Sequence, residues 1–504
     1  MSKIKKVLAV FLTLAMVLGM GMTTFAAGTD KDHPGVPDAT DAALVSVENI
    51  EAGATLTAYQ IVDAAYDKSG NGVTGYIWAP GTPNAGQKAN LDEITSDSIT
   101  ELAKNTAGLT EVKQNFNPTE TKLEVGTWMI IVTPPAQDAE KVYNPMIVSV
   151  YYSTDLTGDN NYPIAGSVDA NTNWTLATKD AFAKSSDVTI SKTVTDAKQE
   201  VGKTVEFTIK STIPSYSSEY VNPIFEITDK IVNGLEYTTT PPVVKVNNQP
   251  LTDGTDYDYK DNGNSFTISF KSDYISKLAG KTAEERAVEV TYSATVTSEA
   301  ITQIGENDVT LNYSTTPSTT SDAKKDHEYT YTFELNGIFQ KVGDDNKGLE
   351  GAEFTLFRKY ENGEVSGKVD IPNNPYVTKK DNDFNILFQG LDSDNTYYLK
   401  ETKAPNGYSI NDTVYTITFN PKFTNDTDGK QILESYEVLV DGKVVSTINY
   451  GTPADEFAIT VKNTKVSELP STGGIGTTIF TIGGCLIMII AAALFFASRR
   501  KENK

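Results

Sequence analysis

The sequence predicts an all-β protein made of three tandem β-sandwich domains. Apolar and polar residues alternate in many short segments, such as MIVSVYYS from Met146, TVEFTIKSTI from Thr204 and AVEVTYSATVTS from Ala287. Turn-forming clusters such as SGNG, DNGN and GDDNKG separate these segments, a combination typical of sandwich strands. Helical periodicity is clearest in LDEITSDSITELAKN, where four apolar residues can share one face: Leu91, Ile94, Ile99 and Leu102. We therefore expect a minor helical element in the first domain.

Two polar segments, TKDAFAKSSD (178–187) and TTPSTTSDAKKDHEY (315–329), divide the predicted strands into groups. We interpret them as domain boundaries, because they hold few residues that could join a core. The expected organisation is a signal peptide at 1–27, an N-terminal domain at 28–185, a middle domain at 186–320, a C-terminal domain at 330–465 and a tail at 466–504.

The two ends of the chain predict export followed by membrane attachment. Three lysines precede the apolar stretch Val7–Leu18, and the small residues Thr24 and Ala26 follow at the spacing of a cleavage site, as in a secretory signal peptide. The run from Ile475 to Ala497 has no charge, is long enough to cross a bilayer, and ends in four cytoplasmic basic residues: Arg499, Arg500, Lys501 and Lys504. Two ordinary membrane anchors are the alternative, but the first apolar run is short for one.

Composition excludes several classes of function. Between the signal peptide and Thr472 the chain has 36 basic and 65 acidic residues, so an acidic surface argues against nucleic-acid binding. The only cysteine, Cys485, lies in the apolar run, so the exported part has no disulfide. The only histidines, His33 and His327, fall in polar stretches, which disfavours histidine-based catalysis and transition-metal sites. We expect no metal and no cofactor.

The segment Leu469-Pro470-Ser471-Thr472-Gly473 stands directly before the apolar run. With the run and the basic tail it resembles the cell-wall sorting signal of Gram-positive surface proteins, whose pattern is Leu-Pro-any-Thr-Gly. The resemblance implies that the membrane transpeptidase sortase cuts between Thr472 and Gly473 and passes the Thr472 acyl group to an amine. It also implies a cell-wall-anchored protein with a membrane-bound precursor.

The C-terminal domain contains FELNGIFQKVGDDNKG, YYLKETKAPNGYSI and FAITVKNTK. These motifs resemble the B-type repeat domain of collagen adhesins and Gram-positive pilins, an immunoglobulin-like β-sandwich. The resemblance implies a covalent amide, an isopeptide bond, between Lys341 on the first strand and Asn463 on the last, promoted by Glu401. A buried lysine loses its proton and can attack, and a buried protonated carboxyl can shuttle protons as ammonia leaves. The alternative is a buried Lys–Glu ion pair beside a strand-capping asparagine.

The middle domain resembles the middle domain of sortase-assembled pilin shafts, on the motifs SDVTISKTVTD, FEITDKIVNG and GENDVTLNYS. The resemblance implies a second isopeptide bond between Lys192 and Asn307 with Asp229 as promoter. Asn312 is the alternative to Asn307, but its opposite strand parity means that one of the two faces outwards. Lys203 and Lys210 lie on a neighbouring predicted strand and are the lysines most easily mistaken for the reactive one.

The first domain resembles the N-terminal domain of the same shaft pilins, in which a lysine near the second domain accepts the sorting-signal threonine of the next subunit. The Tyr-Pro-Lys form of that motif is absent here, and NWTLATKDAFAKSSD stands in its place. Lys184 is our candidate acceptor and Lys179 the second; either could equally be a solvated lysine.

The functional prediction is a structural protein: the backbone subunit of a covalently polymerised pilus, whose partners are sortase, copies of itself and peptidoglycan. The rival hypothesis is a wall-anchored monomeric adhesin or minor pilin that binds host matrix or glycans. A secreted hydrolase fits less well, because no His–Ser or His–Cys constellation is present. We expect no enzyme activity beyond self-made isopeptide bonds.

Overall fold

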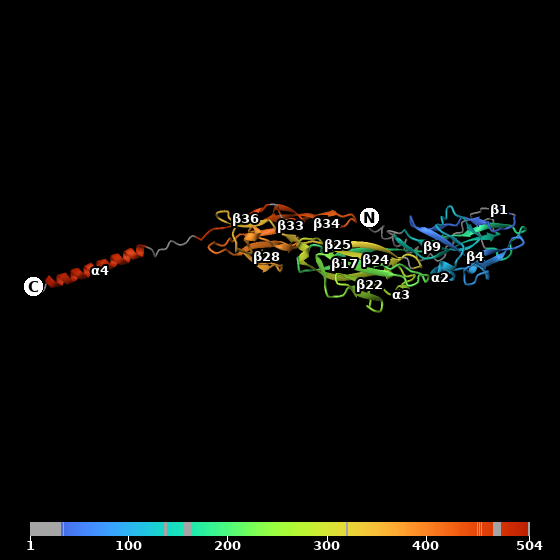
Figure 1. Cartoon of the computed structure of the whole chain (residues 1–504), viewed down its shortest axis with the longest axis horizontal. Coiled ribbons are helices and arrows are strands. Elements are labelled where there is room, and N and C mark those ends of the chain that lie inside the picture. The colour runs from blue at the N-terminus through green and yellow to red at the C-terminus, as the bar shows by residue number, and fades with distance from the viewer. Residues whose placement is uncertain are drawn as a thin grey trace. The chain divides into compact units, whose positions relative to one another are not determined.

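The computed structural model describes residues 32–33, 35–135, 139–154, 163–318, 321–450, 452, 454, 456–466 and 475–501 (Figure 1). The predicted signal peptide and the Leu-Pro-Ser-Thr-Gly segment lie outside the described residues. The chain divides into two compact units, one covering residues up to Tyr331 together with Asn425–Gln431, the other covering Thr332–Thr424 and everything from Ile432. The first unit holds two separate hydrophobic cores, which correspond to the first two groups of predicted strands.

The first core lies on an eight-stranded sheet, with the short helix α2 (Ser96–Lys104) and the 3₁₀ turns η1 (Leu91–Glu93) and η2 (Thr106–Gly108) beside it. The sheet order is β1 (Asp32–His33), β12 (Trp174–Lys179), β11 (Met146–Ser153), β9 (Gly126–Thr133), β4 (Thr55–Tyr66), β5 (Val73–Trp78) and β6 (Lys88–Ala89), with β7 (Val112–Lys113) on β4. Three small pairs complete it: β2 (Ala42–Ala43) with β8 (Leu123–Glu124), β3 (Val47–Glu48) with β13 (Ala181–Phe182), and β10 (Lys141–Tyr143) with β14 (Ser185–Asp187).

The predicted helical element is confirmed. The four apolar residues Leu91, Ile94, Ile99 and Leu102 are all buried in the first core, as a shared face requires. Thr95 caps the helix in a reciprocal capping box with Ser98, which is why the helix begins at Ser96.

The second core lies between two antiparallel sheets. One has the order β15 (Ile190–Val194), β16 (Thr204–Thr212), β23 (Ala287–Val296), β19 (Val243–Val246) and β20 (Gln249–Pro250), with β18 (Leu235–Tyr237) on β23. The other has the order β21 (Tyr257–Asp261), β22 (Ser265–Phe270), β17 (Phe225–Asn233), β24 (Gly305–Ser314) and β25 (Ser321–Thr330). The connections include α3 (Ser272–Ser276), η3 (Glu284–Arg286) and η4 (Ser298–Ile301).

Sequence alternation becomes burial alternation in this sandwich. On β16, Val205, Phe207 and Ile209 face the core, while Glu206 and Lys210 are exposed. Each strand therefore contributes one apolar face to the space between the sheets, which is the arrangement that a β-sandwich requires.

The second unit is a further β-sandwich. Its large sheet has the order β29 (Glu364–Lys368), β28 (Glu353–Glu361), β32 (Tyr397–Lys403), β33 (Val414–Asn425), β34 (Gln431–Val440) and β35 (Lys443–Asn449), with β30 (Tyr376–Val377) on β28. Two pairs accompany it, β26 (Phe333–Glu334) with β31 (Gln389–Leu391), and β27 (Phe339–Gly343) with β36 (Ile459–Asn463); η5 (Lys380–Asn382) is a connection. The pair β27–β36 is parallel, so the early and the late strand of this sandwich run side by side.

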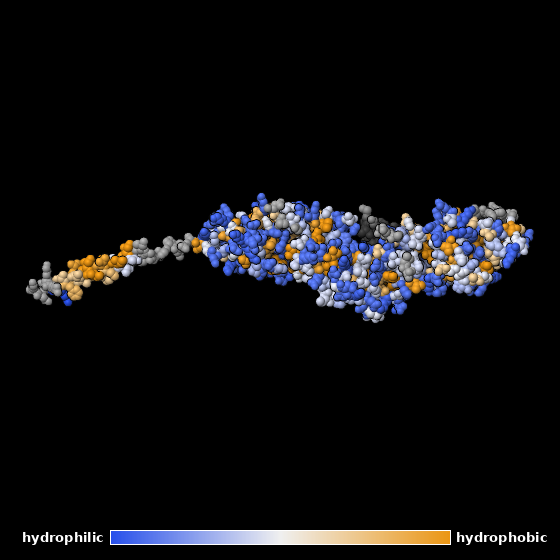
Figure 2. Space-filling view, viewed as in Figure 1, coloured by the Kyte–Doolittle hydropathy of each residue, from blue (hydrophilic) through white to orange (hydrophobic). Residues whose placement is uncertain are grey.

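The helix α4 (Ile475–Lys501) ends the described chain, and its segment Thr478–Arg499 is long and apolar enough to cross a membrane. Figure 2 shows its surface as an apolar band, in contrast to the largely polar surface of the sandwiches. Apolar side chains such as Phe480 and Ile487 are exposed along it. The helix begins at the predicted Ile475 and continues four residues beyond the predicted end at Ala497.

Both segments that we interpreted as linkers are largely strands. Residues 178–187 contribute the end of β12 together with β13 and β14, and residues 321–330 form β25, which pairs with β24 along its whole length. The physical reason is that β25 is an edge strand: it needs only one partner and can keep polar side chains on its solvated face. The middle sandwich consequently extends through Thr330, ten residues beyond our boundary at 320.

Candidate functional sites

A cluster of three buried polar residues lies inside the middle sandwich. Lys192 projects inwards from β15 of one sheet, whereas Asp229 on β17 and Asn307 on β24 project from the facing sheet. All three side chains are 0% exposed. Since β17 and β24 are neighbours, and Asn307 is in register with Ile231, the carboxyl and the amide come from adjacent positions. A cross-link from Lys192 to Asn307 would therefore join one sheet to the other.

The hydrogen bonds of this middle cluster centre on Asp229. The Lys192 Nζ donates to Asp229 Oδ2, and it also lies 3.4 Å from the backbone oxygen of Asp308. Two tyrosines flank the carboxylate: the hydroxyl of Tyr237 donates to Oδ1 and that of Tyr292 to Oδ2, each at 2.7 Å. The sequence prediction did not include these tyrosines.

The amide of Asn307 meets a tyrosine and not the carboxyl. Its Nδ2 donates to the Tyr292 hydroxyl at 2.9 Å. Its Oδ1 is buried with no hydrogen-bond partner among the described residues. A buried amide oxygen without a partner is unfavourable, so the site leaves the Asn307 carbonyl unstabilised in this arrangement.

Burial lowers the pKa of Lys192 from its usual value, although the nearby Asp229 opposes this shift. The Nζ lies 5.3 Å from the centre of the Phe207 ring and 5.6 Å from that of Tyr292, so the amine is enclosed by aromatic rings. An amine with a lowered pKa exposes its lone pair more readily, which is the property a nucleophile needs.

A second cluster lies inside the C-terminal sandwich. Lys341 on β27 and Asn463 on β36 belong to the parallel pair, and Glu401 reaches them from β32 in the large sheet. The three side chains are at most 2% exposed. Lys341 is in register with Val461 and Asn463 lies two positions further along β36, so the lysine and asparagine point to the same side of the pair.

The carboxyl of this cluster touches the asparagine directly. Asn463 Nδ2 donates to Glu401 Oε1 at 2.7 Å, and Asn463 Oδ1 accepts from Lys341 Nζ at 2.5 Å. The amine also donates to the backbone oxygen of Val461 at 3.0 Å and lies 3.9 Å from Glu401 Oε1. The backbone N–H of Asn411 donates to Glu401 Oε2 at 2.8 Å and holds the carboxyl in place.

Burial shifts both titratable groups of the C-terminal cluster towards their neutral forms. It lowers the pKa of Lys341 to about 8, against the opposing charge of Glu401. It also raises the pKa of Glu401 above its usual value, although hydrogen bonds from Asn411 and Asn463 oppose this. A neutral amine beside an amide and a protonated carboxyl can form a new amide bond with loss of ammonia.

The alternative residues lie elsewhere. Lys203 is partly exposed and Lys210 is exposed, so neither shares the core of the middle sandwich. Asn312 is also partly exposed, and its Nδ2 lies 3.4 Å from Glu226 on the outer side of the sheet.

The two candidate acceptor lysines differ in exposure. Lys184 is exposed between β13 and β14, and its backbone oxygen accepts from the N–H of Asn144 at 3.0 Å, so its exposed side chain stands on a hydrogen-bonded backbone. Lys179 is the last residue of β12, is paired with Ser149, and is only partly exposed.

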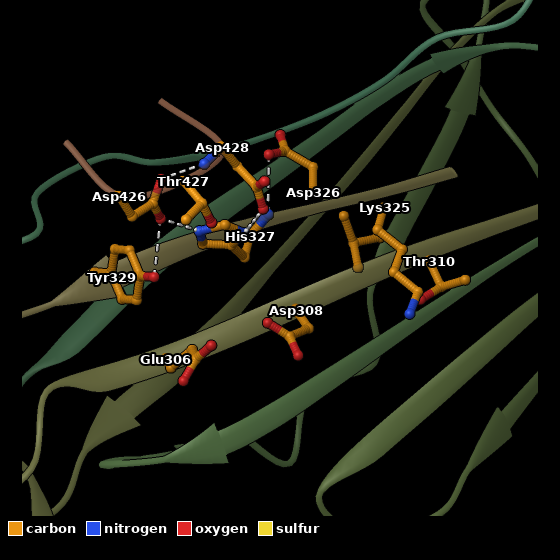
Figure 3. Close-up of a pocket in the computed structure, with 11 residues that line it drawn as sticks. Glu306, Asp308, Thr310, Lys325, Asp326, His327, Tyr329, Asp426, Thr427 and Asp428 are labelled. Carbon is orange, nitrogen blue, oxygen red and sulfur yellow. Dashed lines mark hydrogen bonds and ion pairs between the residues drawn. The ribbon is translucent and has the colours of Figure 1, made fainter. Parts of the chain in front are cut away.

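A polar pocket of about 340 Å³ lies outside the middle core, against β24, β25 and the turn at 426–428 (Figure 3). His327 and Tyr329 both point to Asp426, at 2.6 Å and 3.0 Å from its Oδ2. His327 is thus a half-buried strand residue, contrary to our interpretation of its segment as a linker.

Among the described residues, no group of three His, Cys, Asp or Glu is arranged to hold a metal ion.

Three family models match parts of the chain. A T6 antigen Ig-like domain matches residues 40–185, a prealbumin-like fold domain matches residues 336–431, and the LPXTG cell wall anchor motif matches residues 461–504. Among curated relatives, the trypsin-resistant surface T6 protein of Streptococcus pyogenes serotype M6 is 27% identical over 97% of this chain and 99% of its own length. The fimbrial subunit type 2 of Actinomyces naeslundii is 24% identical over 64% of this chain and 62% of its own length.

Solved structures show the same fold. The T6 backbone pilin of serotype M6 Streptococcus pyogenes matches with a TM-score of 0.58 and 20% identity, covering 86% of this chain and 100% of that one. The full-length major pilin SpaD from Corynebacterium diphtheriae matches with a TM-score of 0.51 and 16% identity, over the same shares of the two chains.

The β-sandwich domains, the anchor motif and the apolar C-terminal helix define the class: this is a cell-wall-anchored surface protein. The similarity to the T6 protein extends over nearly the whole of both chains, and it includes the Ig-like domain that carries the T6 name. The chain is therefore similar, over nearly its whole length, to the Gram-positive sortase-anchored major pilins. The predicted resemblance, fold class and location are thus confirmed.

Proposed function

We propose that sortase joins each subunit through Thr472 to Lys184 of the next subunit, and joins the last subunit to peptidoglycan. The exposure of Lys184 and its position on a fixed backbone support this choice over Lys179. Sortase must bring a bulky acyl-enzyme to the acceptor amine, and only an exposed side chain on a supported segment allows that approach.

We further propose that the subunit makes two internal isopeptide bonds, Lys192–Asn307 and Lys341–Asn463, with Asp229 and Glu401 as promoters. The observation that carries this proposal is that two fully buried lysines each share a core with a carboxyl and an asparagine. A buried charged lysine is costly, whereas a lysine converted to an amide has no charge to bury. The reaction needs no cofactor, because the fold supplies the proximity.

Both amides would close loops of more than 100 residues, as the separation of 122 between Lys341 and Asn463 illustrates. By analogy with a disulfide, such a closure stabilises the folded state by on the order of 4–5 kcal/mol. The sandwiches contain no cysteine and therefore no disulfide. The proposed amides would cross-link their strands in place of disulfides, and an amide resists reduction.

The test of the intersubunit link is peptide mass spectrometry on the protein released from native cell walls. We expect Thr472 joined to a peptide that contains Lys184. Lys184→Arg should abolish the ladder of covalent polymers, while the matched variant Lys179→Arg should leave it intact. If Thr472 carries only a peptidoglycan stem peptide in the wild type, the protein is a monomeric wall-anchored adhesin and the proposal fails.

A further inference from the structure

The two clusters differ in what stands between the carboxyl and the leaving nitrogen. In the C-terminal cluster Glu401 Oε1 contacts Asn463 Nδ2 directly at 2.7 Å. In the middle cluster no described hydrogen bond joins Asp229 to Asn307. Instead, Asn307 Nδ2 donates to the Tyr292 hydroxyl at 2.9 Å and that hydroxyl donates to Asp229 Oδ2 at 2.7 Å. The carboxylate of the shorter aspartate is therefore connected to the asparagine through the hydroxyl of one tyrosine.

We propose that Tyr292 is a catalytic residue of the middle cluster, which relays a proton from Asp229 to the departing nitrogen of Asn307. The inference rests on the proposed Lys192–Asn307 isopeptide bond and adds to it the path by which ammonia is released. Asp229 Oδ2 accepts from both Lys192 Nζ and Tyr292, so one oxygen connects the nucleophile to the relay.

The proton balance of the reaction fixes the direction of each step. Lys192 first gives a proton to Asp229, and its neutral Nζ then forms a bond to Cγ of Asn307. The amide nitrogen cannot accept a hydrogen bond while its lone pair is delocalised, so in the resting site it donates to Tyr292. After the attack Cγ is tetrahedral and the lone pair of Nδ2 is no longer delocalised, so Nδ2 becomes basic and the Tyr292 hydrogen bond reverses.

Asp229 then passes its proton to the Tyr292 oxygen as Tyr292 gives its own proton to Nδ2. The Cγ–Nδ2 bond breaks and ammonia leaves. Asp229 finally takes the remaining extra proton from Nζ, so that the new amide nitrogen keeps one hydrogen. The phenol is restored and every proton is accounted for: of the three Nζ protons of Lys192, one leaves with ammonia, one stays on the new amide and one remains on Asp229, which starts as a carboxylate and ends as a neutral carboxyl. No oxidant or other reactant is consumed.

The packing of Tyr292 suits this role. Its ring stacks on Phe207 at a centroid distance of 5.5 Å and meets the edge of Phe266 at 5.0 Å, so the hydroxyl has a fixed position. Burial, with the nearby Asp229, raises the pKa of Tyr292 well above its usual value. The phenol therefore keeps its proton at physiological pH and can act only by exchanging one proton for another.

Tyr237 provides a matched control. Its hydroxyl also donates to Asp229 at 2.7 Å, but to Oδ1, and it forms no described hydrogen bond with Asn307. Replacing either tyrosine with phenylalanine removes one hydroxyl that donates to the same carboxyl, from partly buried Tyr237 or from buried Tyr292. Only the change at Tyr292 removes a contact with the reacting atoms.

The experiment uses the mature chain, residues 28–472, purified unfolded from inclusion bodies and then refolded. Samples are quenched over time, and the two cross-linked peptides are quantified separately by mass spectrometry. We expect Tyr292→Phe to slow the Lys192–Asn307 bond about 100-fold, the usual size of a general acid's contribution. The Lys341–Asn463 bond of the same molecules should form at the wild-type rate, and Tyr237→Phe should have a much smaller effect.

Equal rates for wild type and Tyr292→Phe would overturn the relay, as would equal slowing by the two phenylalanine variants. If the wild type itself never forms the Lys192–Asn307 peptide, the proposed isopeptide bond fails and the relay with it. Refolding of the wild type in heavy water gives a second test that needs no variant. The middle bond, with two protons in transfer, should slow more than the C-terminal bond, and an equal or smaller effect would contradict the proposal.

Discussion

The middle cluster spans its sandwich from sheet to sheet, whereas the C-terminal cluster joins two parallel neighbours. Lys192 faces Asn307 across the core of two antiparallel sheets, while Lys341 and Asn463 lie on the paired strands β27 and β36. An amide in the middle sandwich would lock the two sheets together. An amide in the C-terminal sandwich would fasten its early strand to its late strand, so that a pull on the chain bypasses the residues between them.

The two clusters also differ in how the carboxyl is connected to the asparagine amide. Glu401 is long enough to contact Asn463 itself, whereas Asp229 is one methylene shorter and reaches Asn307 through Tyr292. On the mechanism that we propose, the reaction requires a continuous path for a proton to the leaving nitrogen. It does not require one particular carboxyl residue.

The largest expected effect comes from removing both nucleophiles with Lys192→Met and Lys341→Met, which keep much of the side-chain volume. The wild-type mature chain should weigh less than its encoded mass by two ammonia molecules, and the double variant should show its full encoded mass. Each lost loop closure removes on the order of 4–5 kcal/mol. Calorimetry should then show both sandwiches melting on the order of 10–20 °C lower. Unchanged melting would mean that the clusters are not covalent in the wild type.

Shortening the side chain that carries the carboxyl of the C-terminal cluster tests whether that carboxyl must contact the leaving nitrogen directly. Glu401→Asp should slow the Lys341–Asn463 bond severely, because no tyrosine hydroxyl among the described residues donates to or accepts from Asn463 Nδ2. The Lys192–Asn307 bond should be unaffected and serves as the control. The measurement is the refolding time course with the two peptides counted separately. A Glu401→Asp chain that closes its bond at the wild-type rate would contradict the argument.

The pH dependence of bond formation should separate the two groups of the C-terminal cluster. The reactive form has a neutral Lys341 and a protonated Glu401. Since burial lowers the pKa of Lys341 to about 8 and raises that of Glu401, the rate should peak between the raised pKa of Glu401 and about pH 8. Acid protonates the amine and alkali removes the carboxyl proton, so the rate falls on both sides. Refolding in buffers across this range measures it, and a rate that still rises well above pH 8 would refute it.

The smallest expected effect concerns a contact that only the middle cluster has. Lys430 Nζ donates to the backbone oxygen of Lys192 at 3.1 Å and pairs with Asp326 and Glu328. Because these side chains are only 16–25% exposed, Lys430→Met should cost slightly more than the loss of a surface ion pair, about 1–2 kcal/mol in the unfolding free energy. Both isopeptide bonds should still form at wild-type rates. A missing Lys192–Asn307 bond in this variant would show that Lys430 helps to assemble the cluster.

Much of this arrangement is predictable from the sequence, because strand alternation decides which side chains share a core. Period-two patterning predicts that only one of Asn307 and Asn312 faces the core, the family resemblance selects Asn307, and the structure buries Asn307. The motif around Glu401 needs a family resemblance, since no spacing rule brings residues 341, 401 and 463 together.

Other features could not be predicted for physical reasons. We predicted a linker where the structure has the strand β25, because an edge strand can carry as many polar residues as a linker does. His327 lies on this strand, so its position was predicted wrongly for the same reason. Tyr292 stands at an ordinary core position of β23, and Tyr237 is a partly buried residue of β18 that packs against the same core. Which carboxyl oxygen each hydroxyl meets depends on how the two sheets pack, and alternation along single strands does not contain that information.

We propose that each buried lysine ends as an amide with its own asparagine, and tandem mass spectrometry of a digest of the folded mature chain would reveal these amides. We expect two branched peptides, one joining Lys192 to Asn307 and one joining Lys341 to Asn463. The mass of each should be the sum of its two component peptides less one ammonia. Linear peptides carrying free Lys192 and Lys341 with intact asparagines would contradict the proposal.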